Sequence, residues 1–335
     1  MQGATISPIF VKMLLEGASL KGYSPEEILR VQGLPTQLLS NNKLRISTLS
    51  FAELFHSVIQ LLRDESFGLM EKPQVRGTFK YVTYACAQAR DVRESLKIWR
   101  DVVNIIDGSL KGSIHLDDNG GYAALHCQRR KGVRHQFITE TSLTTLHRVH
   151  CWLSNEFLPI EKVELAYPEP SFSEEYRFLF YGAPVLFGQK RNALHFSHGS
   201  LNMPVRRSRD ELDELIKNVH VRLITQPRRS TSIPIKIRLW MENIFRDGSS
   251  SPHLVEAAKH VGMSEQTLRR HLKKDGYSFQ QLKEDTRRDM AIHFINGKQY
   301  SVEEIAFKLG FSEASTFIRA FKKWTGVTPL AYRKL

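Results

Sequence analysis

Gln266, Arg269 and Arg270 carry long polar side chains at spacings that a helix would present toward one side. Arg can form paired hydrogen bonds with guanine, and Gln can do so with adenine, in the DNA major groove. Ser315, Thr316 and Arg319 form a similar set farther along the chain, with fewer long donors. Either set alone would also fit an ordinary solvated helix face, so the surrounding pattern has to decide between the two interpretations.

Hydroxyl and ammonium groups lie beside both sets, where they could hydrogen-bond to phosphates. Cations also suit the last turn of a helix, because the helix dipole is negative there. The candidate phosphate contacts are Ser264, Thr267, Lys273, Lys274, Ser312, Lys322 and Lys323.

The surrounding pattern of residues occurs twice, once over residues 255–274 and again over residues 302–323. In each copy an apolar stripe predicts a short helix, a glycine (Gly262 or Gly310) allows a tight turn, and a serine (Ser264 or Ser312) begins a second helix. Ser301 and Glu304 have the spacing of a capping box. Two helix-turn-helix motifs are therefore predicted, at about 252–274 and 301–324. Because the pattern occurs twice, base recognition by these residues is favoured over an ordinary solvated helix face.

A third helix, from Ser278 to Gly297, is predicted between the motifs. About eighteen residues at 1.5 Å each span roughly 27 Å. Major grooves on one side of B-DNA lie about 34 Å apart, so two motifs held by this helix could enter successive grooves with some DNA bending.

The C-terminal region resembles the DNA-binding domain of the AraC/XylS family of bacterial transcription regulators. The matching positions are Arg288, Ala291, Ile305-Ala306, Gly310-Phe311, Phe317, Phe321-Lys322, Gly326-Val327-Thr328-Pro329 and Tyr332-Arg333. The resemblance implies that Gln266, Arg269, Arg270, Ser315, Thr316 and Arg319 contact bases. It also implies double-stranded DNA and RNA polymerase as partners.

Charge and composition agree with this interpretation. The net charge is +13, and residues 228–335 hold +9 of it, with 20 Lys/Arg against 11 Asp/Glu. Such a basic region suits a polyanion. No apolar run is long enough to span a membrane, the N-terminus does not look like a signal peptide, and three cysteines without CxxC spacing fit a reduced cytoplasm.

The first 205 residues predict a mixed α/β domain. Helices are expected at residues 6–20, from Ser24, at 49–62, 78–88, 92–106 and 141–157. Strands are expected at 108–116 and 122–130, joined by a hairpin turn at Asp117–Gly120, and at 162–166, 184–187 and 193–196.

Residues 51–69 and 181–205 resemble the arabinose-binding-like sensor domain of one AraC-family branch, which includes regulators of amino-acid catabolism. The resemblance implies a small-molecule effector without identifying it. Tyr84, Trp99, Trp152 and Phe187 are candidates for lining an effector pocket, although aromatic residues are more often simply core.

Residues 206–233 are expected to connect the sensor to the DNA-binding domain, 234–335, which begins with a helix at 234–245. Leu212, Ile216, Val219 and Leu223 step by four, three and four, as in a short coiled-coil seam that would pair two protomers. A helix docked on its own sensor domain explains the spacing equally well. Residues 227–232 predict a polar linker.

The sequence gives little support for metal binding, catalysis or cofactor binding. His147, His150 and Cys151 have helical spacing, with His126 and His135 nearby, but Val149 and Leu153 favour an ordinary packed helix over a metal site. His195 and His198 are expected to be surface or core polar residues. No catalytic set, phosphate loop or cofactor motif is found. The sequence therefore predicts an effector-controlled transcription regulator. The competing hypotheses are an enzyme or metal-binding protein with a DNA-binding tail, and a sequence-tolerant architectural protein.

Overall fold

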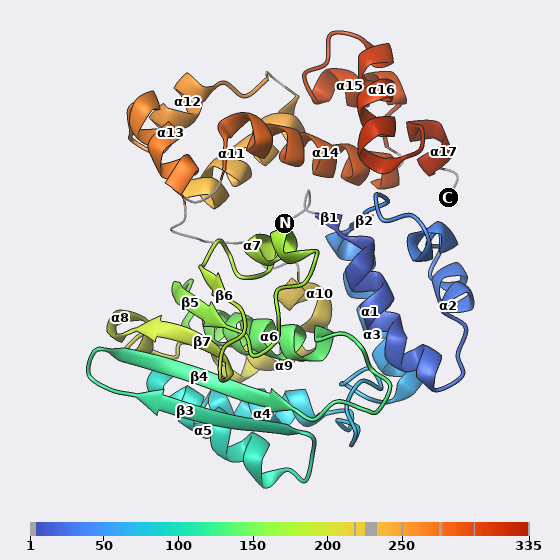
Figure 1. The fold of residues 1–335 in the computed structure, drawn as a ribbon. Helices are drawn as coiled ribbons and strands as arrows, with labels where there is room; N and C mark the ends of the chain where they lie inside the picture. The colour runs from blue at the N-terminus through green and yellow to red at the C-terminus, as the bar shows by residue number, and fades with distance from the viewer. Residues whose placement is uncertain are drawn as a thin grey trace. The chain divides into compact units, whose positions relative to one another are not determined.

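The computed structural model describes residues 5–217, 219–224, 233–248, 251–274, 277–297 and 299–333. A sheet-containing N-terminal part is followed by a helical C-terminal part (Figure 1), so the predicted mixed α/β and all-α classes are confirmed. Contacts divide the chain into two compact units. One contains residues 13–25 and 55–229, and the other contains residues 1–12, 26–54 and 230–335. The boundaries 1–205, 206–233 and 234–335 stay a prediction.

The first unit is built on a five-stranded sheet in the order β3-β4-β7-β5-β6. Its strands are β3 (Leu110–Leu116), β4 (Gly120–Cys127), β5 (Ile160–Glu164), β6 (Val185–Leu186) and β7 (Asn192–Ser197). β5 and β6 pair in parallel, and the other pairs are antiparallel. The predicted hairpin is confirmed, because β3 and β4 pair from Leu110 opposite Cys127 to Leu116 opposite Gly121. The Asp117 carboxylate accepts the Asn119 N–H at 2.8 Å and so fixes the turn.

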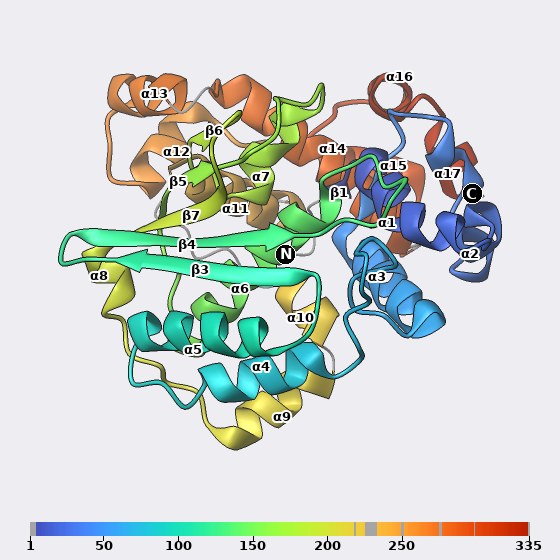
Figure 2. The same ribbon diagram turned by 60° about the horizontal axis from the view of Figure 1, so that its bottom comes forward.

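Helices α5 (Val92–Ile105) and α6 (Phe137–Ser154) lie against one face of this sheet (Figure 2). Gly112 in β3 makes the close approach of α5 possible, since a Cβ there would lie only 2.8 Å from the Trp99 ring. Asp91 begins α5 by accepting the Glu94 N–H at 2.8 Å. The short helices α4 (Thr78–Cys86), α7 (Tyr176–Leu179), α8 (His198–Leu201), α9 (Arg209–Lys217) and α10 (Val219–Ile224), with the 3-10 turn η2 (Ser173–Glu175), complete the elements of this part of the chain.

The second unit contains α11 (Ile233–Asp247), α12 (Leu254–His260), α13 (Glu265–Lys274), α14 (Phe279–Gly297), α15 (Val302–Lys308), α16 (Ala314–Thr325) and α17 (Pro329–Arg333). It also includes the antiparallel pair of β1 (Thr5–Ile6) and β2 (Ile46–Ser47), α2 (Pro25–Val31) and the 3-10 turn η1 (Thr36–Leu39). Helices α1 (Pro8–Leu20) and α3 (Thr48–Leu62) begin in this unit. Among the described residues, no helix has the length and apolar character needed to cross a membrane.

Several predicted boundaries needed correction. The first helix starts at Pro8 and not at residue 6, because Thr5 and Ile6 pair with β2. The helix predicted at 141–157 runs from Phe137 to Ser154, and it ends where Asn155 adopts a left-handed conformation with φ 56°. The bridge over 208–226 contains two short helices, α9 and α10. The predicted linker at 227–232 lies outside the described residues.

Candidate nucleic-acid interface

The first helix-turn-helix motif consists of α12 and α13. Gly262 follows α12 with φ 70°, a left-handed conformation that glycine adopts without a steric penalty. The Ser264 hydroxyl then caps α13 by accepting the Thr267 N–H at 3.2 Å. Leu268 and Leu272 are buried, so the opposite side of α13 faces solvent.

The three base-reading residues predicted in this motif lie on the solvent side of α13. Gln266, Arg269 and Arg270 are all exposed. The Arg269 guanidinium is 4.0 Å from the Glu265 carboxylate, an exposed pair that costs little to separate. These side chains are therefore available to reach into a groove.

The second motif consists of α15 and α16, and its predicted capping box is confirmed. Ser301 accepts the Glu304 N–H at 3.1 Å, and the Glu304 carboxylate accepts the Ser301 N–H at 2.6 Å. Gly310 makes the turn with φ 73°. The second helix begins later than predicted: α16 starts at Ala314, and Glu313 occupies the N-cap position in place of Ser312.

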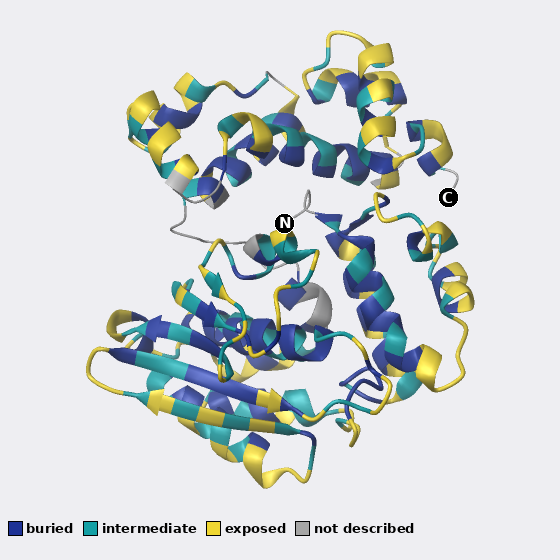
Figure 3. Cartoon of the chain, in the orientation of Figure 1, coloured by how far each residue is buried: buried dark blue, intermediate teal, exposed yellow. Residues whose placement is uncertain are grey.

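Ser315, Thr316 and Arg319 are exposed on α16, opposite the buried Phe317 and Phe321. The Ser315 hydroxyl donates to the Glu313 carboxylate at 3.0 Å, which holds an acceptor beside the predicted donors. Figure 3 shows exposed residues along both α13 and α16. The two sets that the sequence selected are thus presented to solvent by equivalent helices.

The predicted phosphate contacts fall into three groups. Lys273, Lys322, Lys323 and Ser312 are exposed near the ends of the two helices. Ser264 and Thr267 already bond to each other, with 2.9 Å between their hydroxyl oxygens, so their first role is to cap α13. The side chain of Lys274 lies outside the described residues.

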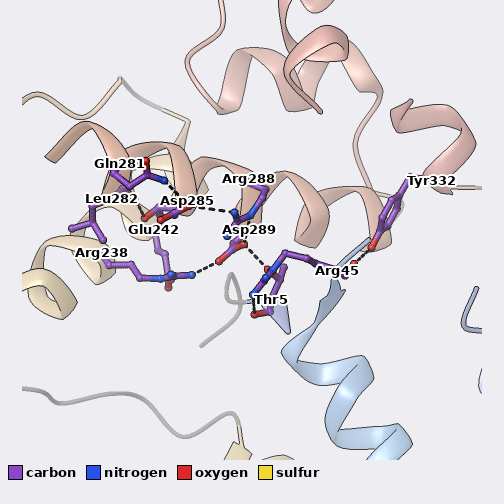
Figure 4. Close-up of polar contacts among 11 residues, drawn as sticks. Thr5, Arg45, Arg238, Glu242, Gln281, Leu282, Asp285, Arg288, Asp289 and Tyr332 are labelled. Atoms are coloured by element: carbon purple, nitrogen blue, oxygen red, sulfur yellow. Dashed lines mark hydrogen bonds and ion pairs between the residues drawn. The ribbon is translucent and has the colours of Figure 1, made fainter. Parts of the chain in front are cut away.

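Helix α14 lies between the two motifs in both views (Figures 1 and 2). It is held to α11 by an ionic cluster, defined here as the buried Arg238, Glu242, Asp285 and Asp289 with the half-buried Arg288 (Figure 4). Arg238 contacts Asp289 at 2.5 Å and Glu242 at 3.1 Å. Arg288 contacts Asp289 and Asp285 at 3.1 and 3.2 Å. Because each charge has an opposite neighbour, the cluster fixes the helix that spaces the motifs.

Asp289 is the centre of the ionic cluster. Burial alone would raise its pKa, but the positive charges of Arg288, Arg238 and Arg45 outweigh that effect and lower the pKa to about 2. The same attraction raises the pKa of Arg238 despite its burial. Both groups therefore stay charged at neutral pH.

The N-terminal strands also contact α14. The Thr5 hydroxyl donates to Asp289 at 2.5 Å, and Arg45 donates to the same hydroxyl at 2.9 Å (Figure 4). Tyr332 of α17 donates to the Arg45 carbonyl oxygen. Sequence reasoning missed these contacts, because Thr5 and Asp289 are 284 positions apart. The only available signal was the presence of Arg238 and Asp289 at inward-facing helix positions.

Comparison with known proteins shows which family has this architecture. Residues 22–205 match the family described as "Arabinose-binding domain of AraC transcription regulator, N-term", and residues 257–335 match "Helix-turn-helix domain". The first match alone covers more than half of the chain. The chain belongs to the AraC family of transcription regulators. It is a non-enzymatic DNA-binding regulator with an N-terminal ligand-binding domain.

One relative of this AraC-family regulator spans nearly its whole length, and others match only a part. The "Ornithine utilization regulator" of Pseudomonas aeruginosa is 25% identical over 335 residues, which is 99% of this chain and 97% of that one. The "Urease operon transcriptional activator" of Escherichia coli is 38% identical over 81 residues, 24% of this chain and 27% of that protein. The crystal structure of the transcriptional regulator CdpR from Pseudomonas aeruginosa matches 92% of this chain and 96% of its own at 17% identity, with a TM-score of 0.33.

The four aromatic candidates for an effector pocket have different neighbours in the AraC-family regulator. Trp99 packs on Gly112 in the core, Tyr84 hydrogen-bonds to Asp213, and Trp152 lies under Arg207. Phe187 packs against other aromatic side chains, Tyr167 and Tyr176. Their role in effector binding stays a prediction.

Of the histidines considered as metal ligands, His147 and His150 are buried in the core, whereas His126 is exposed. His147 Nε2 lies 2.8 Å from the Leu158 carbonyl oxygen and 3.4 Å from the Cys151 sulfur. Burial lowers the pKa of His147 to about 4 and raises that of Cys151 to about 12, so both are neutral near pH 7. The described part of the chain contains no group of three or more His, Cys, Asp or Glu residues placed to hold a metal ion.

The proposed coiled-coil seam is largely covered within one chain. Leu212, Val219 and Leu223 are buried, and Ile216 is half-buried. Helix α10 contacts α6 of the same unit. This burial favours the docked-helix interpretation, and dimerisation through the seam stays a prediction.

Proposed function

We propose that this AraC-family regulator recognises one DNA sequence by placing α13 and α16 in successive major grooves. The observation that carries the proposal is the matched exposure of the two predicted base-reading sets on equivalent helices. Helix α14 has 19 residues, or roughly 28 Å at 1.5 Å each. That length is close to the 34 Å or so between adjacent groove faces, and modest DNA bending would supply the difference.

Individual side chains would have distinct roles. Arg269 and Arg270 suit guanine, and Gln266 suits adenine. In the second motif, Ser315 and Thr316 offer hydroxyls that either donate or accept, and Arg319 offers the one long donor of the set. Lys273, Lys322 and Lys323 would neutralise phosphates and contribute affinity without sequence information.

We infer that a small molecule bound by the N-terminal domain controls this DNA binding. The family match over residues 22–205 supports a ligand-binding role, and the full-length relative named for ornithine utilisation supports an effector from amino-acid metabolism. As a transcription regulator, the protein would act on RNA polymerase in the cytoplasm. Its three described cysteines are free and buried, which suits a reducing compartment.

Binding selection followed by competition tests the proposal. Random duplexes enriched by the full chain should converge on one asymmetric site, and that site should be preferred over bulk DNA by roughly 10³-fold or more. Equal affinity for all duplexes would instead identify an architectural DNA-binding protein. Stoichiometric zinc in the purified chain, lost on changing His147 and Cys151, would revive the metal-binding alternative.

A further inference from the structure

Helix α6 is buried along most of its length, yet it carries a row of polar side chains. Glu140, Thr144, His147 and Cys151 are spaced four, three and four residues apart, so they lie on one face. Thr144 donates to the Glu140 carbonyl oxygen at 2.9 Å, and His147 bonds to Leu158. Glu140 is the only carboxylic acid of this row, and it is 1% exposed.

The two carboxyl oxygens of Glu140 have different surroundings. Oε1 accepts hydrogen bonds from the hydroxyls of Tyr167, at 3.0 Å, and Tyr176. Oε2 is buried and has no hydrogen-bond partner among the described residues. Glu140 also has no ion pair with any lysine, arginine or histidine whose side chain the structure describes. A buried carboxyl oxygen without a partner costs free energy, so this arrangement is incomplete as a purely structural feature.

Aromatic side chains cover this carboxyl. They belong to residues 167–187, which connect β5 toward β7 and are called the aromatic strap below. Tyr176 stacks between Phe172 and Phe180, with ring centroids 6.0 and 5.9 Å apart and planes within 15° and 9°. Phe187 meets the Tyr176 ring edge-on at 5.4 Å. The surroundings of Glu140 thus combine one unpartnered acceptor oxygen with two tyrosine hydroxyls and the aromatic side chains packed behind them.

That combination is selective for a positive charge. A cation is attracted by a carboxylate, and this attraction strengthens when water is excluded. A neutral or anionic ligand would not gain it. We propose that Glu140 and the aromatic strap form the subsite for a positively charged amine group, ammonium or guanidinium, of a small effector. This inference rests on the proposed effector-binding role of the N-terminal domain.

Entry of such a ligand requires the strap to move, because Glu140 and Tyr176 are almost completely buried. Within residues 167–187, the sheet includes only Val185 and Leu186, in β6 at its edge. Most of the strap can therefore open without breaking the central strand pairs. A bound amine would hold the aromatic strap in its closed position. Ligand binding would thereby change how the strap packs on the N-terminal domain.

Amine binding would also be coupled to protonation of Glu140. Burial raises the pKa of Glu140 to about 7, and the hydrogen bonds from Tyr176 and Tyr167 only partly offset this effect. The groups that face the carboxyl are these two tyrosines, whose pKa values are raised. His147, two turns farther along the same helix, has a pKa lowered to about 4 by burial. None of the three titrates near pH 7. An ammonium group prefers the ionised carboxylate, so affinity should be about tenfold higher at about pH 8 than at about pH 6.

Thermal-shift measurements and calorimetry on the full chain test the inference. The probes are putrescine, agmatine and benzylamine; 1,4-butanediol is the neutral counterpart of the first two, and benzyl alcohol is that of benzylamine. At least one amine should raise the melting temperature by about 5 °C when present at roughly a hundredfold excess over its Kd, and its neutral counterpart should have no effect. Glu140→Gln should abolish the shift, and Glu161→Gln, which changes an exposed residue of β5, should preserve it.

Two results would overturn the inference: no response of the wild-type chain to any of the three amines, or an unchanged response of Glu140→Gln. If Glu140→Gln does not fold, the predicted pH dependence of the wild type and weaker amine binding by Tyr176→Phe take its place. Loss of the pH dependence would then count against Glu140. DNA binding is measured separately. A chain that binds its DNA site but no amine refutes only this subsite, whereas one that binds an amine but no specific DNA refutes only the proposed function.

Discussion

At the scale of single residues, the protein has two classes of polar side chains, exposed ones that are available to DNA and buried ones that stabilise the fold. Gln266, Arg269 and Arg270 are exposed, whereas Arg238 and Asp289 are buried and paired. Both classes are charged or polar, so composition alone does not distinguish them. Only the buried face of each helix shows which residues serve the fold and which are available for DNA.

Arg270→Ala should weaken binding to the selected site by about 1–3 kcal/mol and relax base preference at one position, because a bidentate contact is lost. Lys273→Ala should weaken binding to all sequences alike and lower the salt-dependence slope by about 1. Fluorescence anisotropy at several salt concentrations distinguishes the two effects. The reverse assignment would show that α13 enters the groove in another orientation.

Arg238→Met should destabilise the helical unit by about 3–5 kcal/mol, because it leaves Glu242 and Asp289 buried with less positive charge nearby. Arg90→Ala, which removes an exposed ion pair with Glu94, is the matched control and should leave the unfolding midpoint nearly unchanged. Urea denaturation measures both. Equal effects of the two changes would mean that the ionic cluster does not hold α11 to α14.

The low pKa of Asp289 also predicts that the stability of the fold decreases at acidic pH. Its folded pKa of about 2 lies below the ordinary value near 3.9, so its stabilising effect is complete above the unfolded pKa and is lost as pH falls toward 2. The wild-type chain should lose roughly 2–3 kcal/mol from this group between about pH 5 and pH 2. In Asp289→Asn this part of the acid sensitivity should be absent. An identical pH profile for the two chains would contradict the assignment.

At the scale of elements, local patterns predicted most helices and the β3–β4 hairpin. The capping box at Ser301 and Glu304 and the turn at Gly262 depend on neighbouring residues, so the sequence shows them directly. The contacts of Thr5 and Arg45 with α14 depend on segments far apart in the chain, and no local pattern encodes them. For the same reason, the Glu140 cluster, which joins α6 to a later connection, escaped prediction.

The turn of the first motif provides a test at this scale. Gly262→Ala should destabilise the helical unit by about 1–2 kcal/mol, because alanine resists the left-handed conformation. Gly262→Asn should cost less, since Asn tolerates that conformation, and a Cβ at this position meets open space. Thermal unfolding of the three chains measures the difference. Equal stability of Gly262→Ala and wild type would show that the turn does not need its positive φ.

At the scale of the whole molecule, the proposed function requires the two helix-turn-helix motifs to bind a single DNA site together. Helix α14 and its ionic cluster set their spacing, and the N-terminal strands β1 and β2 contact the same helix. Methylation-interference footprinting of the full chain on its selected site tests this most directly, because guanine N7 methylation blocks major-groove contacts. The predicted result is interference in two groove segments about one helical turn, or 10 base pairs, apart. Arg269→Ala with Arg270→Ala should remove only one of these segments, and Arg319→Ala should weaken only the other. Interference in a single segment, or loss of both segments from changes in one motif, would contradict the account.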